Sequence, residues 1–311
     1  MLTHIAVDIG GTQMRAASYA SDERAPLKLS RIPTRINDQP ILERLVALIA
    51  SVWPENERVA GIAIAAPGPV NPFEGMLLSA PNIPEWVNFP LSKTLQEHFQ
   101  VPVVLGNDAN LAALGEWKFG AGSGHHHLIY LTVSTGVGSG IIIDDRLLLG
   151  EQGLAAELGH VTVVRDGPLC SCGKPGHLEA LAAGPAIARW VEHELACGVS
   201  SNLAHETQLT ALKVAEAARA GDLLAITALQ RAGTYLGMAI ADYLHIFNPT
   251  LVIIGGGVSR SGDLLLNPLR QALQANIFNP HYLDNFSVAI ATLRDDAGLL
   301  GALALIREHG V

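Results

Sequence analysis

The fold is decided by the stretch IAVDIGGTQMRAASY, residues 5–19. Its first part, Ile5 to Ile9, is a short apolar and β-branched run that predicts a strand, and Met14 to Tyr19 predicts a second strand. The GGT sequence at residues 10–12 can turn the chain tightly, because glycine permits positive φ angles. The stretch therefore predicts a strand, a glycine turn and another strand.

A similar unit recurs in the second half of the chain as LIYLTVSTGVGSGIIID, residues 128–144. Leu128 to Val133 predicts a strand, Ser134 to Gly140 a glycine-rich turn, and Ile141 to Asp144 the strand that follows. One such unit in each half indicates a duplicated architecture.

Between and after these units, strand patterns alternate with helical ones. Helices are predicted at 41–52, 91–99, 109–118, 185–196, 211–220, 223–247, 264–277 and 297–308, and further strands at 59–65, 101–105, 250–254 and 287–291. Asp296 is expected to cap the last helix. The alternation predicts layered α/β domains with partly parallel sheets. We place a smaller first domain at 1–118 plus 296–311 and a larger second domain at 119–295, with a crossing near 120–124.

Composition excludes several classes of protein. The 311 residues suffice for two domains, and the net charge of −9 without a Lys/Arg cluster argues against a nucleic-acid partner. No uninterrupted apolar run reaches the roughly 20 residues of a membrane span, and no secretory signal is expected at the N-terminus. Three cysteines are too few for a disulfide framework, so a reducing compartment, the cytoplasm, is the expected location.

Three glycine turns are candidates for binding phosphate. They lie at residues 8–12, 135–138 and 255–257. Glycine leaves backbone N–H groups accessible to an anion, so the three turns could hold phosphates and a nucleoside. None of them has the Walker pattern or the GxGxxG pattern of dinucleotide-binding domains.

A cluster of metal-ligating residue types follows the second glycine turn. Its members are His160, Cys170, Cys172 and His177. Two thiolates and two imidazoles suit a closed tetrahedral zinc site, whose four protein ligands leave no open position for a catalytic water. The alternative is a turn with two idle thiols and two surface histidines. Glu157 and Glu179 flank the cluster and remain available for a polyhydroxylated ligand.

These motifs together resemble the ROK family of sugar kinases, within the sugar kinase, Hsp70 and actin superfamily. The resemblance covers essentially the whole chain. It is carried by DIGGT at 8–12, APGPV at 66–70, GNDAN at 106–110, TGVGSG at 135–140, ELGH at 157–160, CSCGKPGHLE at 170–179 and NPTLVIIGGGVS at 248–259.

The resemblance implies an α/β fold of two actin-like (ribonuclease H-like) ATPase domains, with the last helix returning to the first domain. It also implies ATP-dependent phosphorylation of the 6-hydroxyl of a hexose, foremost glucose, with Mg²⁺ and a structural Zn²⁺. Family members are commonly homodimers, so a homodimer is expected.

Residue roles follow from the same resemblance. Asp108 matches the catalytic base. The substrate-binding positions are Gly68, Asn107, Asp108, Glu157, His160 and Glu179. The first phosphate loop is Asp8, Gly10, Gly11 and Thr12, with Asp8 near the hydration shell of magnesium. The second loop is Thr135, Gly136, Val137 and Gly138, and the residues expected against adenosine are Gly255, Gly256 and Gly257.

The sequence departs from the family pattern at His177, where the family usually has a third cysteine. Some roles also keep alternatives. Asp108 could instead cap the helix that starts near Ala109. Arg15 could support Asp8 or a phosphate, or form a surface ion pair. Cys197 is expected to pack as a small apolar group.

Other functions remain open besides the phosphorylation of glucose. The nearest are an N-acetylmannosamine or other amino-sugar kinase, a fructokinase and an allose kinase. A different class is a noncatalytic sugar sensor. Sugar-responsive ROK repressors carry an N-terminal helix-turn-helix domain, whereas the first strand here is expected at about Ile5, so a DNA-binding role is not expected.

Overall fold

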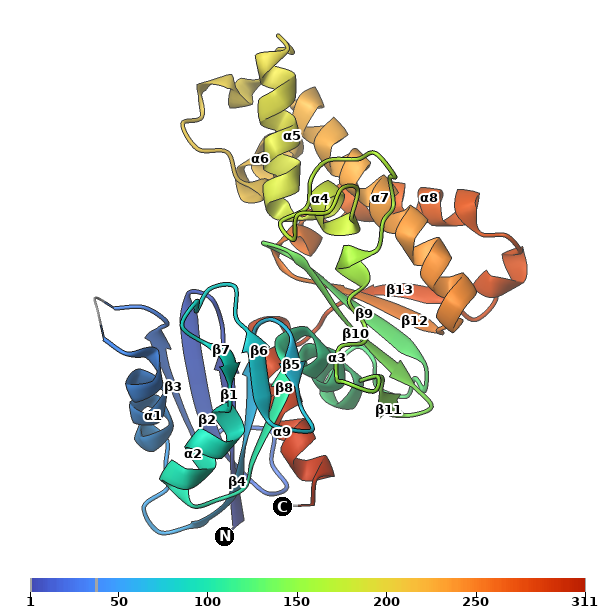
Figure 1. Cartoon of the computed structure of the whole chain (residues 1–311). Coiled ribbons are helices and arrows are strands. Elements are labelled where there is room, and N and C mark those ends of the chain that lie inside the picture. The colour runs from blue at the N-terminus through green and yellow to red at the C-terminus, as the bar shows by residue number, and fades with distance from the viewer. Residues whose placement is uncertain (1, 37–38, 311) are drawn as a thin grey trace. The chain divides into compact units, whose positions relative to one another are not determined.

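The computed structural model describes residues 2–36 and 39–310 (Figure 1). Met1 and Val311, the outer ends of the predicted first domain, lie outside the described residues. The chain divides into two compact units. Unit 1 comprises the chain up to Gly124, Gly140–Ala156 and the chain from Thr292, and unit 2 comprises His125–Ser139 and Glu157–Ala291.

Unit 1 contains a five-stranded sheet with the strand order β3-β2-β1-β4-β8. The strands are β1 (Leu2–Ile9), β2 (Gln13–Ala20), β3 (Lys28–Pro33), β4 (Arg58–Ala66) and β8 (Val103–Asn107). The tight turn after β1 returns β2 antiparallel to it, and β3 pairs antiparallel with β2. Strands β1, β4 and β8 are parallel, so their carboxyl ends meet at one edge.

Alternating side chains bury both faces of this sheet. Ile5 and Val7 of β1 belong to a core that includes side chains of α1 (Ile41–Ser51) and α2 (Leu91–Phe99). Ala6, between them, belongs to a second core with α3 (Asp108–Phe119) and α9 (Ala297–Glu308). Successive side chains of a strand point to opposite faces, so the two helix pairs cover opposite faces of the sheet (Figure 1).

Five strands were not predicted. They are β3 and the two-residue β11 in the large sheets, and a small three-stranded sheet of β5 (Val70–Asn71), β6 (Met76–Ser79) and β7 (Val87–Phe89). Four of the five are two to four residues long, too short for an alternating pattern to emerge. The loop before β7 is pinned by Trp86, which is buried and stacks on Phe89 with ring centroids 5.3 Å apart.

The second large sheet repeats the strand order of the first as β11-β10-β9-β12-β13. Its strands are β9 (Leu128–Val133), β10 (Val137–Ile143), β11 (Arg146–Leu147), β12 (Leu251–Gly255) and β13 (Ser287–Ile290). The repetition confirms the duplicated architecture. The predicted turn at 134–140 was too long, because β10 already begins at Val137 and the glycines at 138 and 140 are accommodated within the strand.

The helices of unit 2 are α4 (Leu178–Ala182), α5 (Gly184–Ala196), α6 (Ala211–Arg219), α7 (Leu223–Phe247) and α8 (Asp263–Asn276). Short 3₁₀ turns are η1 (Leu158–His160), η2 (Asn202–His205), η3 (Gly257–Ser261) and η4 (Pro280–Leu283), and η5 (Arg294–Asp296) lies in unit 1. Helices α7 and α8 lie side by side (Figure 1). They can approach closely because Gly237 has no side chain. A Cβ at this position would lie 2.2 Å from the Leu269 carbonyl oxygen.

Helix α7 is long and apolar enough to cross a membrane by length and composition alone. However, 56% of its most apolar window is buried inside the structure, as is usual for a helix in a protein core. Such a helix is weak evidence of a membrane span.

Three expectations differ from the structure in detail. Asp296 occupies the N-cap position of α9, but its side chain makes no capping hydrogen bond and pairs with Arg15 instead. Cys197 is exposed at the end of α5 rather than packed. The compact units also depart from the predicted boundaries, because 119–124, 140–156 and 292–295 belong to unit 1. Segment 140–156 packs closely against the rest of unit 1. At Gly153 the packing is so tight that a Cβ would lie 2.1 Å from Pro72 Cδ.

Candidate active site

In unit 1, the predicted site residues gather at the carboxyl edge of the sheet. Asp8 lies near the end of β1, Gly68 follows β4, and Asn107 ends β8. The Asn107 side-chain amide donates to the Gly68 carbonyl oxygen at 3.0 Å, which joins two of the loops. Ligands of α/β proteins bind where parallel strands end, so this edge is the natural position for a substrate site.

Asn107, not Asp108, caps α3. Its Oδ1 accepts hydrogen bonds from the Ala109 and Asn110 N–H groups, both at 3.0 Å. The capping alternative for Asp108 is therefore wrong. Asp108 is the first residue of the helix, and its Oδ1 accepts from the Ala109 N–H at 2.8 Å. Strand end and helix start together fix the position of this carboxylate.

Asp8 is held by Arg15 through an ion pair of 2.7 Å, and both side chains are mostly buried. Burial raises the pKa of Asp8, and the Arg15 guanidinium opposes that shift. Arg15 also contacts the Asp295 carbonyl oxygen and the Asp296 carboxylate. Arg15 thus supports Asp8, and its interaction is more than a surface ion pair.

The glycine turn after β1 leaves no room for larger residues. A Cβ at Gly10 would lie 2.8 Å from the Gln13 carbonyl oxygen, and one at Gly11 would lie 2.4 Å from the Asn82 amide nitrogen. The side chain of Asn82 therefore lies against the predicted phosphate loop, 71 positions away in the sequence.

In unit 2, two of the predicted nucleotide-binding loops line a single pocket of about 430 Å³. Thr135 comes from the loop between β9 and β10, and Gly257 from the turn after β12. β9 and β12 are parallel neighbours, which brings the two loops together. The remaining lining is mainly apolar, from α5 and α6 and the segment before α6, with guanidinium groups from Arg219 and Arg260.

Glu157 directly precedes the turn η1 and His160 is its last residue, and two buried hydroxyl groups hold this turn in place. The Tyr243 hydroxyl donates to the Leu158 carbonyl oxygen at 2.7 Å, and the Leu158 N–H donates to Ser139 Oγ at 3.0 Å. Burial raises the pKa of Glu157, His160 lowers it, and the nearby Glu179 carboxylate raises it further.

We expect Tyr243→Phe to lower the free energy of unfolding by about 1–2 kcal/mol, because it leaves the buried Leu158 carbonyl without its hydroxyl donor. Urea denaturation measures this change. Tyr235→Phe is the matched control, since Tyr235 lies on the same helix, is only partly buried and packs its ring against Arg231. Equal stability of the two variants would contradict the role of Tyr243.

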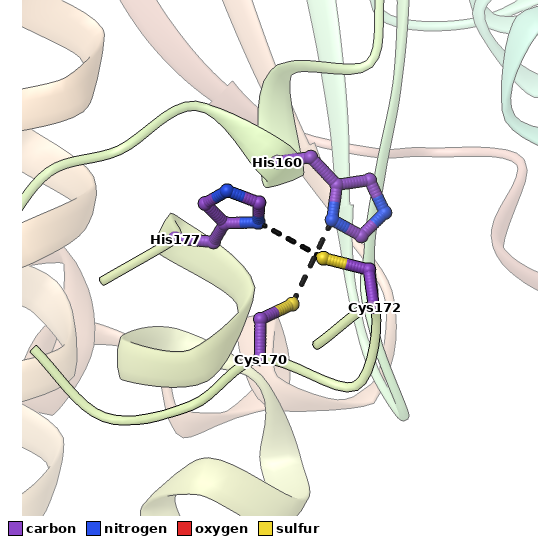
Figure 2. Close-up of side chains that lie close together, drawn as sticks. All are labelled: His160, Cys170, Cys172 and His177. Atoms are coloured by element: carbon purple, nitrogen blue, oxygen red, sulfur yellow. Dashed lines mark hydrogen bonds between the residues drawn. The ribbon is translucent and has the colours of Figure 1, made fainter. Parts of the chain in front are cut away.

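The structure brings together the four predicted metal ligands (Figure 2). Their ligand atoms all lie within 4.8 Å of one another. Cys170 Sγ is 3.7 Å from His160 Nδ1, and Cys172 Sγ is 3.3 Å from His177 Nδ1. Figure 2 shows the two thiols and the two rings converging on one point.

The donor set fits a zinc ion. Bonds of about 2.3 Å to sulfur and 2.0–2.1 Å to nitrogen place tetrahedral ligand atoms about 3.3–3.8 Å apart, close to the spacing found here. Burial lowers the pKa of His177, as do the charges of His160 and Lys174, although Glu179 opposes the shift. The neutral ring that a metal requires is thereby favoured. Positive φ angles at Gly173 and Gly176 close the turn that carries the thiols.

Glu179 connects this turn to the second phosphate loop. Its Oε1 accepts from Ser171 Oγ at 2.5 Å and from Cys170 Sγ at 3.3 Å, and its Oε2 accepts from the Val137 N–H at 3.1 Å. Burial raises the pKa of Glu179, but these hydrogen bonds outweigh it, so the pKa lies below its usual value. No pattern in the sequence indicated this connection.

Each unit therefore holds part of the predicted site. The residues at 8–12, 68, 107 and 108 lie in unit 1, and those at 135–138, 157, 160, 179 and 255–257 lie in unit 2. Sequence reasoning missed Tyr243 and the apolar pocket residues Leu209 and Leu212, because their partners are distant in the sequence.

A sequence model of the ROK family matches residues 4–309. A glucokinase from Thermotoga maritima is 38% identical over 98% of this chain and 97% of its own length. A xylose repressor from Caldicellulosiruptor bescii is 35% identical over 80% of this chain and 62% of its own length.

Solved structures agree with the sequence match. A ROK family glucokinase from Streptomyces griseus, crystallised with glucose and AMPPNP, superposes with a TM-score of 0.81 at 35% identity, covering 98% of this chain and 99% of that one. The predicted α/β fold of the actin-like superfamily is confirmed by this likeness. The family match over nearly the whole chain and the 38% identity to a full-length relative show that the chain belongs to the ROK family.

Proposed function

We propose that this protein is an ATP-dependent glucokinase, which transfers the γ-phosphoryl group of ATP to the 6-hydroxyl of glucose with Mg²⁺. The observation that carries the proposal is Asp108, a carboxylate fixed at the start of α3 on the sheet edge that also bears the Asp8 loop. The full-length similarity to glucokinases supports the same reaction.

The protein does not need to form a covalent intermediate for this reaction. Phosphoryl transfer requires alignment of donor and acceptor, neutralisation of phosphate charge and removal of the acceptor proton. Asp108 accepts the proton of the 6-hydroxyl as general base. Asp8, steadied by Arg15, lies at the loop proposed to face the magnesium hydration shell.

The nucleotide is proposed to occupy the unit 2 pocket. Its apolar lining suits a base, and the backbone N–H groups of residues 135–138 and 255–257 suit phosphates and ribose. Residues 10–12 of unit 1 contribute the other phosphate loop. Closure on the sugar would exclude water and limit ATP hydrolysis.

The sugar is proposed to contact Gly68, Asn107, Asp108, Glu157, His160 and Glu179. Carboxylate, amide and imidazole groups suit sugar hydroxyls. A zinc ion held by His160, Cys170, Cys172 and His177 would supply structural rigidity. His160 could ligate zinc through one ring nitrogen and face the sugar with the other, which would orient the ring for its hydroxyl partner.

The test is ADP release by the purified protein with MgATP and, separately, glucose, mannose, fructose, allose, N-acetylglucosamine and N-acetylmannosamine. We expect glucose to give the highest kcat/KM, with NMR identifying glucose 6-phosphate. Preference for an amino sugar or fructose would keep the mechanism and change the substrate.

A noncatalytic sugar sensor is the second candidate, favoured by the similarity to a xylose repressor. Tight sugar binding with no ADP formation on any sugar would establish it. We further propose a homodimer, testable by light scattering, and a cytoplasmic location, where a thiolate site stays reduced.

A further inference from the structure

Glu116 of α3 is a fully buried carboxylate that the proposed reaction does not use. Its Oε1 accepts from the Leu293 N–H at 2.7 Å. Its Oε2 accepts from the Ala121 N–H at 2.8 Å and from Thr292 Oγ1 at 3.1 Å. A buried carboxylate is retained where its oxygens are satisfied, and here three donors satisfy them.

All three donors belong to segments through which the chain passes between the units. The chain crosses between the units four times: one crossing follows Gly124 and another precedes Thr292, and the other two follow Ser139 and Ala156. The backbone carbonyl oxygen of Glu116 also accepts from the Gly120 and Gly122 N–H groups, at 3.0 and 2.9 Å. One residue thus fixes the unit 1 ends of two crossings that are about 170 positions apart in the sequence.

The glycines of the first crossing fall into two kinds. A Cβ at Gly120 would lie 2.1 Å from Glu116 Oε2, so glycine there makes room for the carboxylate. Gly124 has a φ of +85° and nothing within 4 Å of a Cβ. The first position is clamped, and the second is open to rotation.

The unit 2 ends of the crossings are fixed as well. The His127 carbonyl oxygen accepts from the Thr250 N–H at 3.0 Å, and the Ala291 N–H donates to the Ile254 carbonyl oxygen at 3.0 Å. Between these points and the Glu116 clamp lie residues 123–126 in one crossing and the Ala291–Thr292 junction in the other.

We propose that Glu116 is a positioning residue that anchors two of the four crossings between the units. It holds 120–122 and 292–293 against α3, so that in these two crossings a change in the relative orientation of the units on sugar binding is absorbed by 123–126 and the Ala291–Thr292 junction. The clamp makes closure reproducible, because hinges work when a few residues absorb the backbone change. This inference rests on the proposed kinase function.

The test is Glu116→Gln, which keeps the size of the side chain but replaces one carboxylate oxygen with an NH₂ group. That group is a donor and faces N–H or O–H donors, so at least one of the hydrogen bonds is lost. Hydrogen exchange should show faster exchange at the Ala121 and Leu293 amides. The glucose KM should rise about tenfold, the effect of losing one such hydrogen bond to a charged group, with a smaller fall in kcat. ATP hydrolysis without sugar should rise relative to phosphorylation.

Ile49→Val is the matched control, because Ile49 lies in the core on the opposite face of the unit 1 sheet and its trimming destabilises the unit without touching a crossing. It should leave the glucose KM within twofold. Wild-type turnover on glucose with a wild-type KM in E116Q would overturn the inference and leave the kinase proposal intact. Absence of sugar turnover in the wild type would overturn both. If E116Q does not fold, Thr292→Val, which removes one donor alone, carries the same measurements, and an unchanged KM and exchange rate in it would overturn the inference.

Discussion

Asp108→Asn is expected to lower kcat on glucose by about 10³-fold, within the range that a general base supplies. The amide keeps the shape of the carboxylate but cannot take the hydroxyl proton. Glucose binding should stay within a few-fold, because an amide oxygen still accepts a sugar hydroxyl. The fold should lose about 0.3–1 kcal/mol at most, the effect of one negative charge in a first helical turn.

Asp263→Asn is the matched control for this substitution. Asp263 is also the first residue of its helix, α8, and its side chain is exposed in a 3.9 Å pair with Arg270. The control should keep full kcat with a similar change in stability. Single-turnover kinetics on both variants, with glucose affinity from calorimetry, make the comparison. A near-normal rate in D108N would remove Asp108 as the base.

Helices and strands were predicted well where the pattern is local and long. Leu91–Phe99, Leu128–Val133, Leu223–Phe247 and Ala297–Glu308 end at the predicted residues, because apolar periodicity and flanking polar residues fix both type and length. The strands of 70–89 were missed because pairs of two to four residues are defined by their partners, which local sequence does not encode.

The site divides in the same way. The grouping of the four predicted metal ligands was predicted correctly, because cysteine and histidine are typical metal-binding residue types in any fold. Glu116 and Tyr243 were missed, since their roles come from groups at 292–293 and 158 that only the folded chain brings near. Asn107 was assigned to the sugar alone, although its position before a helix also made it a cap.

Replacing a metal ligand is the second change expected to have a large effect. Cys172→Ser should lower zinc affinity at least about 100-fold, because it substitutes a weak hydroxyl ligand for a thiolate. The turn should then lose its restraint, and with it the hydrogen bonds that Glu179 makes to Ser171 and to the Val137 amide. Zinc content by mass spectrometry should fall from one ion per chain toward zero, with a lower Tm and a higher glucose KM.

Cys197→Ser separates this effect from thiol loss in general. Cys197 is exposed and directly follows α5, outside the cluster, so its replacement should leave zinc content and Tm unchanged. His177→Cys, which restores the cysteine usual in the family, should bind zinc at least as tightly as the wild type. Wild-type protein that keeps its Tm and glucose KM after complete zinc removal would show that the four side chains form a stable turn unaided.

Because Glu179 touches both the turn and the Val137 amide, loss of zinc should weaken ATP binding together with glucose binding, whereas a ligand set that served the sugar alone would leave the ATP affinity unchanged.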